Sequence, residues 1–153
     1  MIRIRPMEAG EVPVVAGMLR ALMLEFVLHE STPEGGATVL RENNEEGIRG
    51  FIDSGFVYHV AEADGAIVGF AGMRDRSHLF HMFVDRNWHR QGVARRLWEA
   101  ARAAAIEAGG SGNFTVNASN YAVPVYEALG FVRTGPTQEA KGMVFNPMAL
   151  NAD

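Results

Sequence analysis

The feature that most constrains the fold of this chain is an apolar run, LFHMFV at 79–84, followed directly by the basic stretch DRNWHRQGVARRLWEAA at 85–101. The first segment has the character of a buried strand, and the second shows helical spacing of its apolar residues beyond Gly92. A helix N-terminus presents unpaired N–H groups and partial positive charge, so a turn of this kind can hold a phosphate. The sequence therefore predicts a strand, a basic turn and a helix in immediate succession.

The remaining patterns predict a mixed sheet covered by helices. Apolar residues at steps of three and four predict helices over 7–30 and 37–53, with a loop at 31–36 between them. Asp64-Gly65, between two β-rich runs, predicts a hairpin. Further strands are expected at 1–6, 78–84, 113–118, 131–135 and 142–150, and further helices at 92–108 and 121–130. Hairpins combined with one strand-helix-strand unit indicate an α/β (α+β) fold in which residues 1–153 form a single domain.

Composition narrows the possible chemistry. A net charge of −4 argues against broad nucleic-acid binding, and no apolar stretch approaches the about 20 residues that a membrane span needs. The absence of cysteine excludes a thiol nucleophile and a Cys-ligated metal, and it fits a cytoplasmic protein. His78 and His81 are three residues apart, so a regular strand would point them to opposite faces and no metal site is expected there.

Two separated motifs resemble one enzyme family. HRQGVA at 89–94 resembles the pyrophosphate-binding signature of the GNAT N-acetyltransferases, Q/R-x-x-G-x-G/A. VNASNYAVPVYEALGF at 116–131 resembles the family's second signature, which ends in Tyr-Glu-x-Leu-Gly-Phe. The resemblance covers nearly the whole chain. It implies the GNAT fold, a mixed, mostly antiparallel twisted sheet of about six to seven strands with a central splay and about four flanking helices. His89 departs from the family's Gln or Arg, and Ala94 replaces its second glycine.

The resemblance also implies acetyl-CoA as co-substrate, bound mainly through main-chain N–H groups of the turn. The strand at 78–84 should separate from the strand at 113–117 and leave main-chain groups of Phe83 and Val84 free for the pantetheine arm. The residues assigned to the cofactor in this way are Phe83, Val84, His89, Arg90, Gln91, Gly92, Val93, Ala94, Arg95, Ser119, Asn120 and Tyr126.

Two of these assignments have alternatives. Counted back from Tyr126, Ser119 occupies the position of the family's Asn and Asn120 stands one residue later, so either fits the pantetheine contact or a helix cap. Arg90, Arg95 and Arg96 fit contacts to the adenosine phosphates, or a solvated helix face.

By the same resemblance, Tyr126 is the catalytic acid that gives its proton to the departing thiolate. A phenol with an ordinary pKa of about 10 is protonated at neutral pH, as this role requires. His78 lies where related enzymes carry a base on a strand, and histidine can accept a proton near neutrality. His81 lies nearer the thioester on the same strand. A structural role is the alternative for both histidines.

The predicted function is transfer of an acetyl group from acetyl-CoA to a primary amine of a small molecule, by direct attack within a ternary complex in a monomer or homodimer. Alternatives are an acyl-CoA-binding sensor without catalysis, acetylation of a peptide or protein amine, and an unrelated nucleotide-binding module. Glu25, His29 and Glu30 end the first predicted helix and could line the acceptor site. The acidic segment at 42–47 fits attraction of a cationic amine or a solvated loop.

Overall fold

The computed structural model describes residues 1–152, and their strands form one continuous sheet in the order β1-β2-β3-β4-β5-β8-β6, with β7 paired to β8. Every pairing is antiparallel except that of β4 with β5. The strands are β1 (Ile2–Pro6), β2 (Val57–Ala63), β3 (Ala66–Arg74), β4 (His78–Val84), β5 (Phe114–Ala118), β6 (Val132–Arg133), β7 (Gln138–Ala140) and β8 (Met143–Leu150). The predicted mixed, mostly antiparallel sheet is confirmed. The short β7 is an addition to it.

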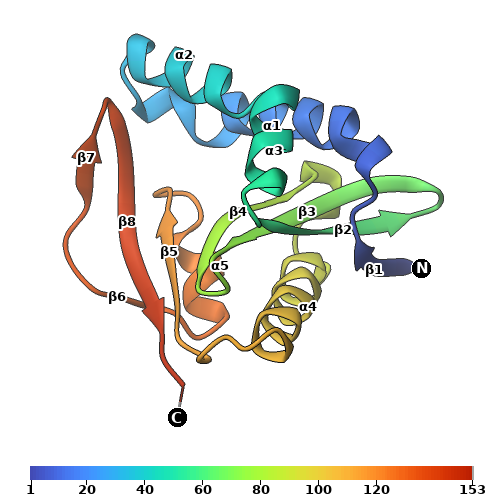
Figure 1. The fold of residues 1–153 in the computed structure, drawn as a ribbon. Helices are drawn as coiled ribbons and strands as arrows, with labels where there is room; N and C mark the ends of the chain where they lie inside the picture. Colours follow the sequence, from blue (N-terminus) through green and yellow to red (C-terminus); the bar gives the residue numbers. More distant parts are fainter. Residues whose placement is uncertain (153) are drawn as a thin grey trace.

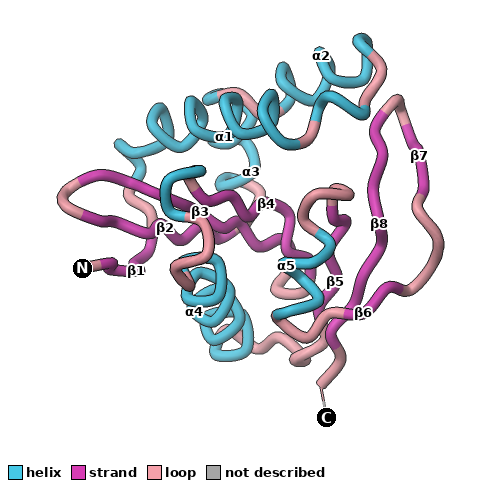
Figure 2. The backbone as a smooth tube through the Cα atoms, turned by 180° about the vertical axis from the view of Figure 1, so that it is seen from behind, coloured by secondary structure: helices cyan, strands magenta, loops and turns pink. Residues whose placement is uncertain are grey.

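Helices cover both faces of the sheet (Figures 1 and 2). They are α1 (Val12–Phe26), α2 (Pro33–Glu42), α3 (Glu45–Asp53), α4 (Val93–Glu107) and α5 (Val123–Ala128). One core packs α1 and α3 against β2 and β3, around side chains such as Leu19, Ile48 and Phe70. The other packs α4 and α5 against the opposite face, around Leu97 and Phe114. No helix in residues 1–152 combines the length and apolarity needed to cross a bilayer.

The predicted loop at 31–36 is wrong, because α2 begins inside it. Thr32 caps this helix, with its Oγ1 accepting a hydrogen bond from the Gly35 N–H at 3.0 Å, and Pro33 takes the first helical position. Gly35 sits in the first turn because the chain of Lys141 passes beside it. A Cβ at this position would lie 2.6 Å from the Lys141 carbonyl oxygen. The glycine that suggests a loop in the sequence therefore serves a close backbone contact.

The two predicted N-terminal helices also have different bounds. Helix α1 covers only the middle of 7–30, with 3₁₀ turns at Ala9–Glu11 and Leu28–Glu30 on either side. The segment predicted as one helix breaks at Asn43 and Asn44. Asn43 Nδ2 donates to the Val39 carbonyl at 2.8 Å, while Asn44 Oδ1 accepts from the Gly47 N–H at 2.9 Å and starts α3.

The two strands at the centre of the sheet separate after a very short contact. Strands β4 and β5 pair only at His78 with Thr115 and at Leu79 with Val116. Beyond Leu79, β4 continues to Val84 while still paired with β3 on its other side. The predicted central splay is therefore present, and the β5-facing main-chain groups of β4 face a gap.

A bulge in β4 changes which side chains share a face. Gly72 pairs with His81 and Met73 pairs with Leu79, so Phe80 is an extra residue in the ladder. Leu79 belongs to the core beneath α4, whereas His81 contacts Tyr58 in the opposite core. The expectation that His78 and His81 point to opposite faces is wrong, because the extra residue shifts the alternation by one.

Candidate active site

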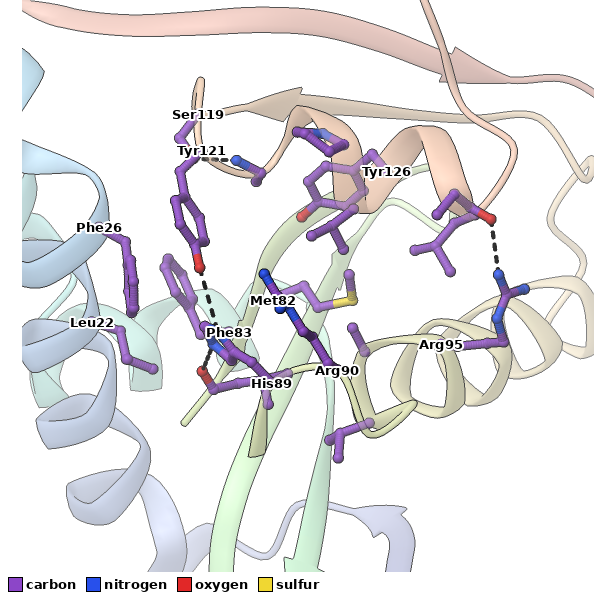
Figure 3. Close-up of a pocket in the computed structure, with 18 of the residues that line it drawn as sticks. Leu22, Phe26, Met82, Phe83, His89, Arg90, Arg95, Ser119, Tyr121 and Tyr126 are labelled. Carbon is purple, nitrogen blue, oxygen red and sulfur yellow. Dashed lines mark hydrogen bonds between the residues drawn. The ribbon is translucent and has the colours of Figure 1, made fainter. Parts of the chain in front are cut away.

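Two cavities meet at the gap between β4 and β5. The larger cavity, of about 550 Å³, lies between the end of α1, the end of β4, the β4–α4 turn and α5 (Figure 3). The smaller cavity, of about 320 Å³, lies between α1, α2, β4, β5 and β8. Both are lined by Val27, Met82, Phe83, Ser119, Ala122 and Tyr126. The cavities thus have a common boundary, and Tyr126 lies on it.

The basic turn opens into the larger cavity through a glycine that the backbone requires. Gly92 is the N-cap of α4, with φ 79° and ψ 8°, a left-handed conformation that favours glycine. A Cβ built on Gly92 would have no protein atom within 4 Å, so the space beside it is open. Glycine supplies no side-chain cap, which leaves N–H groups of the first turn of α4 without such a partner. This geometry allows an anion to approach the main chain closely.

His89 joins the turn to the end of β4. Its Nε2 donates a hydrogen bond to the Val84 carbonyl oxygen at 2.8 Å. Its ring lies 5.4 Å from that of Phe26, and Phe26 in turn lies 4.6 Å from Tyr121 (Figure 3). The residue that departs from the family signature is therefore part of the wall of the larger cavity, between α1 and the β5–α5 loop.

Residues before and within the first turn of α4 line the larger cavity, and one of them also packs in the core. Arg90 (φ 63°), Gly92, Val93, Ala94 and Arg95 all line the larger cavity. The buried Val93 anchors the helix in the core. Arg95 Nη2 donates to the Ala128 carbonyl at 2.8 Å, which links α4 to the end of α5 across the cavity (Figure 3).

Two further residues of the basic stretch lie away from the larger cavity. Gln91 Nε2 donates to the Asn87 carbonyl at 3.2 Å within the turn. Arg96 Nη1 donates to the Ile2 carbonyl at 2.8 Å, toward β1. Neither side chain lines a cavity, so the structure favours Arg90 and Arg95 over Arg96 for contact with an anionic ligand.

Tyr126 is almost completely buried, at 5% exposure, and packs edge-on against Phe131 at 5.7 Å. Its hydroxyl points into the larger cavity (Figure 3). Burial raises the pKa of this phenol above its ordinary value of 10.0. The hydroxyl is therefore protonated across the physiological range and faces the site.

The structure separates Ser119 from Asn120. Ser119 lines both cavities. Asn120 instead donates from Nδ2 to Glu30 Oε2 at 2.6 Å and accepts from the buried Asn146 Nδ2 at 2.8 Å. Both ends of the Asn120 amide are therefore engaged, whereas Ser119 Oγ accepts from the Ala122 N–H at 3.3 Å, the contact of the helix-cap alternative, while its side chain also lines the cavities.

Phe83 and Val84 lie at the end of β4, past the two residues that pair with β5. Phe83 lines both cavities and Val84 lines the larger one. Phe83 pairs with Phe70 and Val84 with Gly69 of β3, and consecutive residues of such a ladder direct their main-chain groups to opposite sides. The Asp85 N–H bonds to the Val68 carbonyl, so the main-chain groups of Phe83 face β3, and the expectation that they are free is wrong. Those of Val84 face away from β3; its carbonyl is held by His89, which leaves its N–H facing the gap. This is where a ligand can add hydrogen bonds to the sheet.

His78 is not brought together with these residues. Its Nδ1 is 2.7 Å from Thr115 Oγ1, at the end of β4 where the strands still pair, and the ring lines neither cavity. Burial, with a smaller contribution from the Arg74 charge, lowers the pKa of His78 to about 4. The imidazole is therefore neutral at pH 7, at a distance from the shared boundary of the cavities.

His81 lies in the wall of the smaller cavity, in a chain of contacts that the sequence does not reveal. Tyr58 Oη donates to His81 Nδ1 at 2.9 Å, and His81 Nε2 donates to Asn43 Oδ1 at 2.9 Å. These roles follow from the amide oxygen, which can only accept. Burial lowers the pKa of His81 to about 3, so the ring is neutral. Tyr58 and Asn43 carry no sequence signal that links them to His81.

The charged and polar side chains predicted to line the acceptor site at the end of the first helix do not form the cavity walls. Glu25 Oε2 accepts from Arg86 Nη1 at 2.7 Å, and His29 lies 3.7 Å from Glu30. None of Glu25, His29 and Glu30 lines either cavity, whereas Glu42 and Asn43 line the smaller one. Of the acidic segment at 42–47, only its first two residues therefore reach the site.

Known structures share this architecture. A GCN5-related N-acetyltransferase from Rhodopseudomonas palustris is 22% identical, with 98% of this chain and 95% of that chain covered and a TM-score of 0.79. The PaiA N-acetyltransferase from Thermoplasma acidophilum, in complex with coenzyme A, is 14% identical, with 99% of each chain covered and a TM-score of 0.78. A GNAT superfamily phosphinothricin acetyltransferase from Sinorhizobium meliloti, in complex with acetyl-CoA, is 17% identical, with 97% and 87% covered and a TM-score of 0.70.

Sequence comparison with family models leads to the same family as the structural comparison, whereas comparison with individual curated proteins does not. No curated protein matches the chain by sequence. The family model described as Acetyltransferase (GNAT) domain matches residues 27–152, which include the basic turn, both separated strands and Tyr126. The chain therefore belongs to the GNAT acetyltransferase family.

Proposed function

We propose that this chain is an N-acetyltransferase that holds acetyl-CoA in the larger cavity and a small primary amine in the smaller one. The observation that carries this proposal is the common boundary of the two cavities at the β4–β5 gap, with the Tyr126 hydroxyl beside it. Two reactants bound on either side of that boundary are held together for direct transfer.

The larger cavity supplies the groups that coenzyme A needs. The first turn of α4, opened by Gly92, offers N–H groups and partial positive charge to the pyrophosphate. Arg90 and Arg95 add positive charge at the same wall. The edge of β4 beyond Leu79, including the Val84 N–H, faces the gap, where an extended pantetheine arm can pair with it. The PaiA relative binds coenzyme A and the phosphinothricin acetyltransferase binds acetyl-CoA, which supports this ligand.

In the reaction, the lone pair of the neutral amine forms a bond to the thioester carbonyl carbon. Collapse of the resulting tetrahedral adduct breaks the C–S bond, and the sulfur takes a proton from Tyr126 Oη. The amine nitrogen releases one proton, and solvent restores the proton on Tyr126. The products are the N-acetyl amide and coenzyme A. Tyr126 is protonated before the thiolate forms, because burial raises the pKa of its phenol.

The proton of the acceptor ammonium has two possible routes. His78 is the base that the family resemblance predicts, but it lies at the paired end of β4 and lines neither cavity. We therefore favour transfer to water. A His78→Ala variant that retains at least half of the turnover supports the water route, and a loss of about 100-fold or more supports His78 as base.

The acceptor is proposed to be a small molecule because the smaller cavity is bounded by elements from both halves of the chain, α1 and α2 on one side and β5 and β8 on the other. Its volume of about 320 Å³ lies at the lower end of ligand cavities. The relative from Sinorhizobium meliloti is named for a small molecule, phosphinothricin.

The first experiment is calorimetric titration of the folded protein with acetyl-CoA, coenzyme A and ATP, followed by thiol release with a panel of amines. Saturable binding of both coenzyme A species without ATP binding, together with amine-dependent thiol release, supports the enzyme. Binding without thiol release for any amine supports an acyl-CoA sensor instead. Absence of binding by a folded sample contradicts both.

A further inference from the structure

The walls of the smaller cavity are predominantly apolar. Apolar side chains from α1, β4, β5 and β8 contribute to them, among them Leu19, Met23, Phe80, Val116, Met143 and Phe145. Six polar side chains also line the cavity, namely Glu42, Asn43, His81, Asn117, Ser119 and Tyr126. The part of an acceptor that contacts the apolar majority of the walls must itself be apolar, because buried polar groups without partners are costly. The sugar-like or multiply charged part of a polar acceptor would lack partners over most of this surface.

The charge in this wall is of one sign. Glu42 is the only acidic residue that lines the smaller cavity, and no arginine or lysine lines it among residues 1–152. His81 adds no positive charge, because its Nδ1 accepts from Tyr58 while its Nε2 donates to Asn43. A cationic amine therefore has one favourable partner. A carboxylate or phosphate on the acceptor has no cationic partner there, and a second ammonium has no second carboxylate.

Phe80 gives the cavity an aromatic wall. As the bulged residue of β4, it lies on the same face of the sheet as His81, with ring centroids 4.4 Å apart. Phe51 meets it edge-on at 5.1 Å and Phe56 at 5.3 Å, while these two rings stack at 5.0 Å from one another. The Arg74 guanidinium also lies over the Phe80 ring, 5.9 Å from its centroid, although Arg74 does not line the cavity. Phe80 is held by these contacts and is still partly exposed, so its ring is fixed in position to pack against an aromatic or alicyclic ligand.

We propose that the acceptor is a primary monoamine with an apolar body of about one ring, in which the ring packs against Phe80 and the Glu42 carboxylate favours the single ammonium over anionic groups. This inference rests on the proposed acetyltransferase function and specifies its substrate class. It follows from three features of the smaller cavity. Most of its walls are apolar, Glu42 is its one acidic lining residue with no arginine or lysine beside it among residues 1–152, and the Phe80 ring is held in place.

Four amines test the proposal by thiol release at saturating acetyl-CoA. 2-Phenylethylamine is the primary monoamine with one ring that the proposal describes. Ethylamine lacks the ring, and phenylalanine adds a carboxylate. Spermidine has further ammonium groups in place of the ring. The expected kcat/KM for 2-phenylethylamine exceeds that of each of the others by about 100-fold or more. Equal or faster turnover of phenylalanine, spermidine or ethylamine overturns the substrate class and leaves the acetyltransferase function intact. Thiol release with no amine, despite bound acetyl-CoA, overturns both.

Two variants connect the selectivity to the named residues. Phe80→Leu should lower kcat/KM for 2-phenylethylamine about tenfold and change that for ethylamine less than about twofold. Glu42→Gln should raise KM for 2-phenylethylamine about threefold with little change in kcat, whereas Glu46→Gln, which removes the same charge outside both cavities, should leave KM unchanged. Neither Phe80 nor Glu42 lines the larger cavity, so acetyl-CoA affinity and melting temperature serve as controls. Equal losses for both amines in Phe80→Leu would place the ring elsewhere and overturn the proposal.

Discussion

The Nε2 of His89 donates a hydrogen bond to the carbonyl oxygen of Val84, 2.8 Å away. This contact joins the turn before α4 to the end of β4 (Figure 3). The proposed pyrophosphate and thioester ends of the cofactor site are thus held at a fixed separation by one side chain. His89, which departs from the Gln or Arg of the family signature, makes this bond with a single N–H donor.

Replacing His89 by Ala removes this bond and the ring contact to Phe26. We expect the Kd for acetyl-CoA to rise about tenfold, which corresponds to about 1.4 kcal/mol, since a typical hydrogen bond contributes about 1 kcal/mol and packing is also lost. Calorimetric titration measures the change. His29→Ala, which alters an exposed histidine outside both cavities, is the matched control and should bind normally. An unchanged Kd for His89→Ala would mean that the bond does not organise the cofactor site.

Replacing Gly92 by Glu should abolish coenzyme A binding. The residue stands at φ 79°, which strains any side chain, and the open space beside it is where the pyrophosphate would lie. A carboxylate there adds both bulk and like charge. Calorimetry measures binding, and circular dichroism establishes that the variant is folded. Normal affinity in a folded Gly92→Glu protein would contradict the assignment of this turn to the pyrophosphate.

Replacing Tyr126 by Phe removes the proposed acid while keeping the ring that packs on Phe131. We expect kcat to fall about 100-fold, the lower end of the usual contribution of general acid catalysis, and the Kd for acetyl-CoA to stay within about twofold. Single-turnover thiol release and calorimetry provide the two readouts. An unchanged kcat would exclude Tyr126 from proton transfer.

Acid should destabilise the protein through His81. Burial depresses the pKa of this ring to about 3 in the folded state, whereas an unfolded histidine titrates near the ordinary value of 6.5. Between these two values the unfolded state binds more protons, so stability is fully present above about pH 6.5 and decreases as pH falls. At pH 5.5 the expected loss from His81 alone is about 1.4 kcal/mol relative to pH 8, and His78, whose pKa burial lowers to about 4, adds a similar amount.

Urea denaturation at a series of pH values measures this effect. His81→Gln keeps groups that can hydrogen-bond to Tyr58 and Asn43 but does not titrate, so its stability should depend less on pH between 5.5 and 8. The same pH dependence in the variant and the parent protein would assign the acid sensitivity to other groups.

Gly35→Ala should destabilise the protein by about 1–3 kcal/mol, because the added Cβ would lie 2.6 Å from the Lys141 carbonyl oxygen. Gly17→Ala and Gly50→Ala are matched controls in the interiors of α1 and α3. Neither has a protein atom within 4 Å of the added Cβ, and each should stabilise by about 0.5–1 kcal/mol. Chemical denaturation measures the free energy of unfolding of the three variants and so tests the predicted loss and the two predicted gains. An unchanged free energy of unfolding in Gly35→Ala would show that the Lys141 segment moves aside at no cost.

The part of the site that depends on neighbouring residues was predictable from sequence. The strand, basic turn and helix occupy the predicted places, because the apolar run, Gly92 and the helical spacing all act within a few residues of one another. The second motif likewise fixes Tyr126 on a short helix after β5.

Features that depend on distant segments were not predictable. Gly35 is consistent with a loop until the Lys141 chain is placed beside it. The bulge at Phe80 has no local signal, because it is defined by pairing with Gly72 and Met73. The engagement of the Asn120 amide depends on Asn146, a residue of β8. In each case the missing information is a contact between parts of the chain far apart in sequence.

The short pairing of β4 with β5 divides the sheet into two halves, β1 to β4 and β5 to β8, which share only two residue pairs across their junction. A pantetheine arm that pairs with β4 in the gap would act as an additional strand joining those halves. Any ligand that binds only the folded state adds to its stability in proportion to the logarithm of ligand concentration. The lifetime of this protein in a cell would then follow its acetyl-CoA supply, since proteases act on the transiently opened chain when the ligand is scarce.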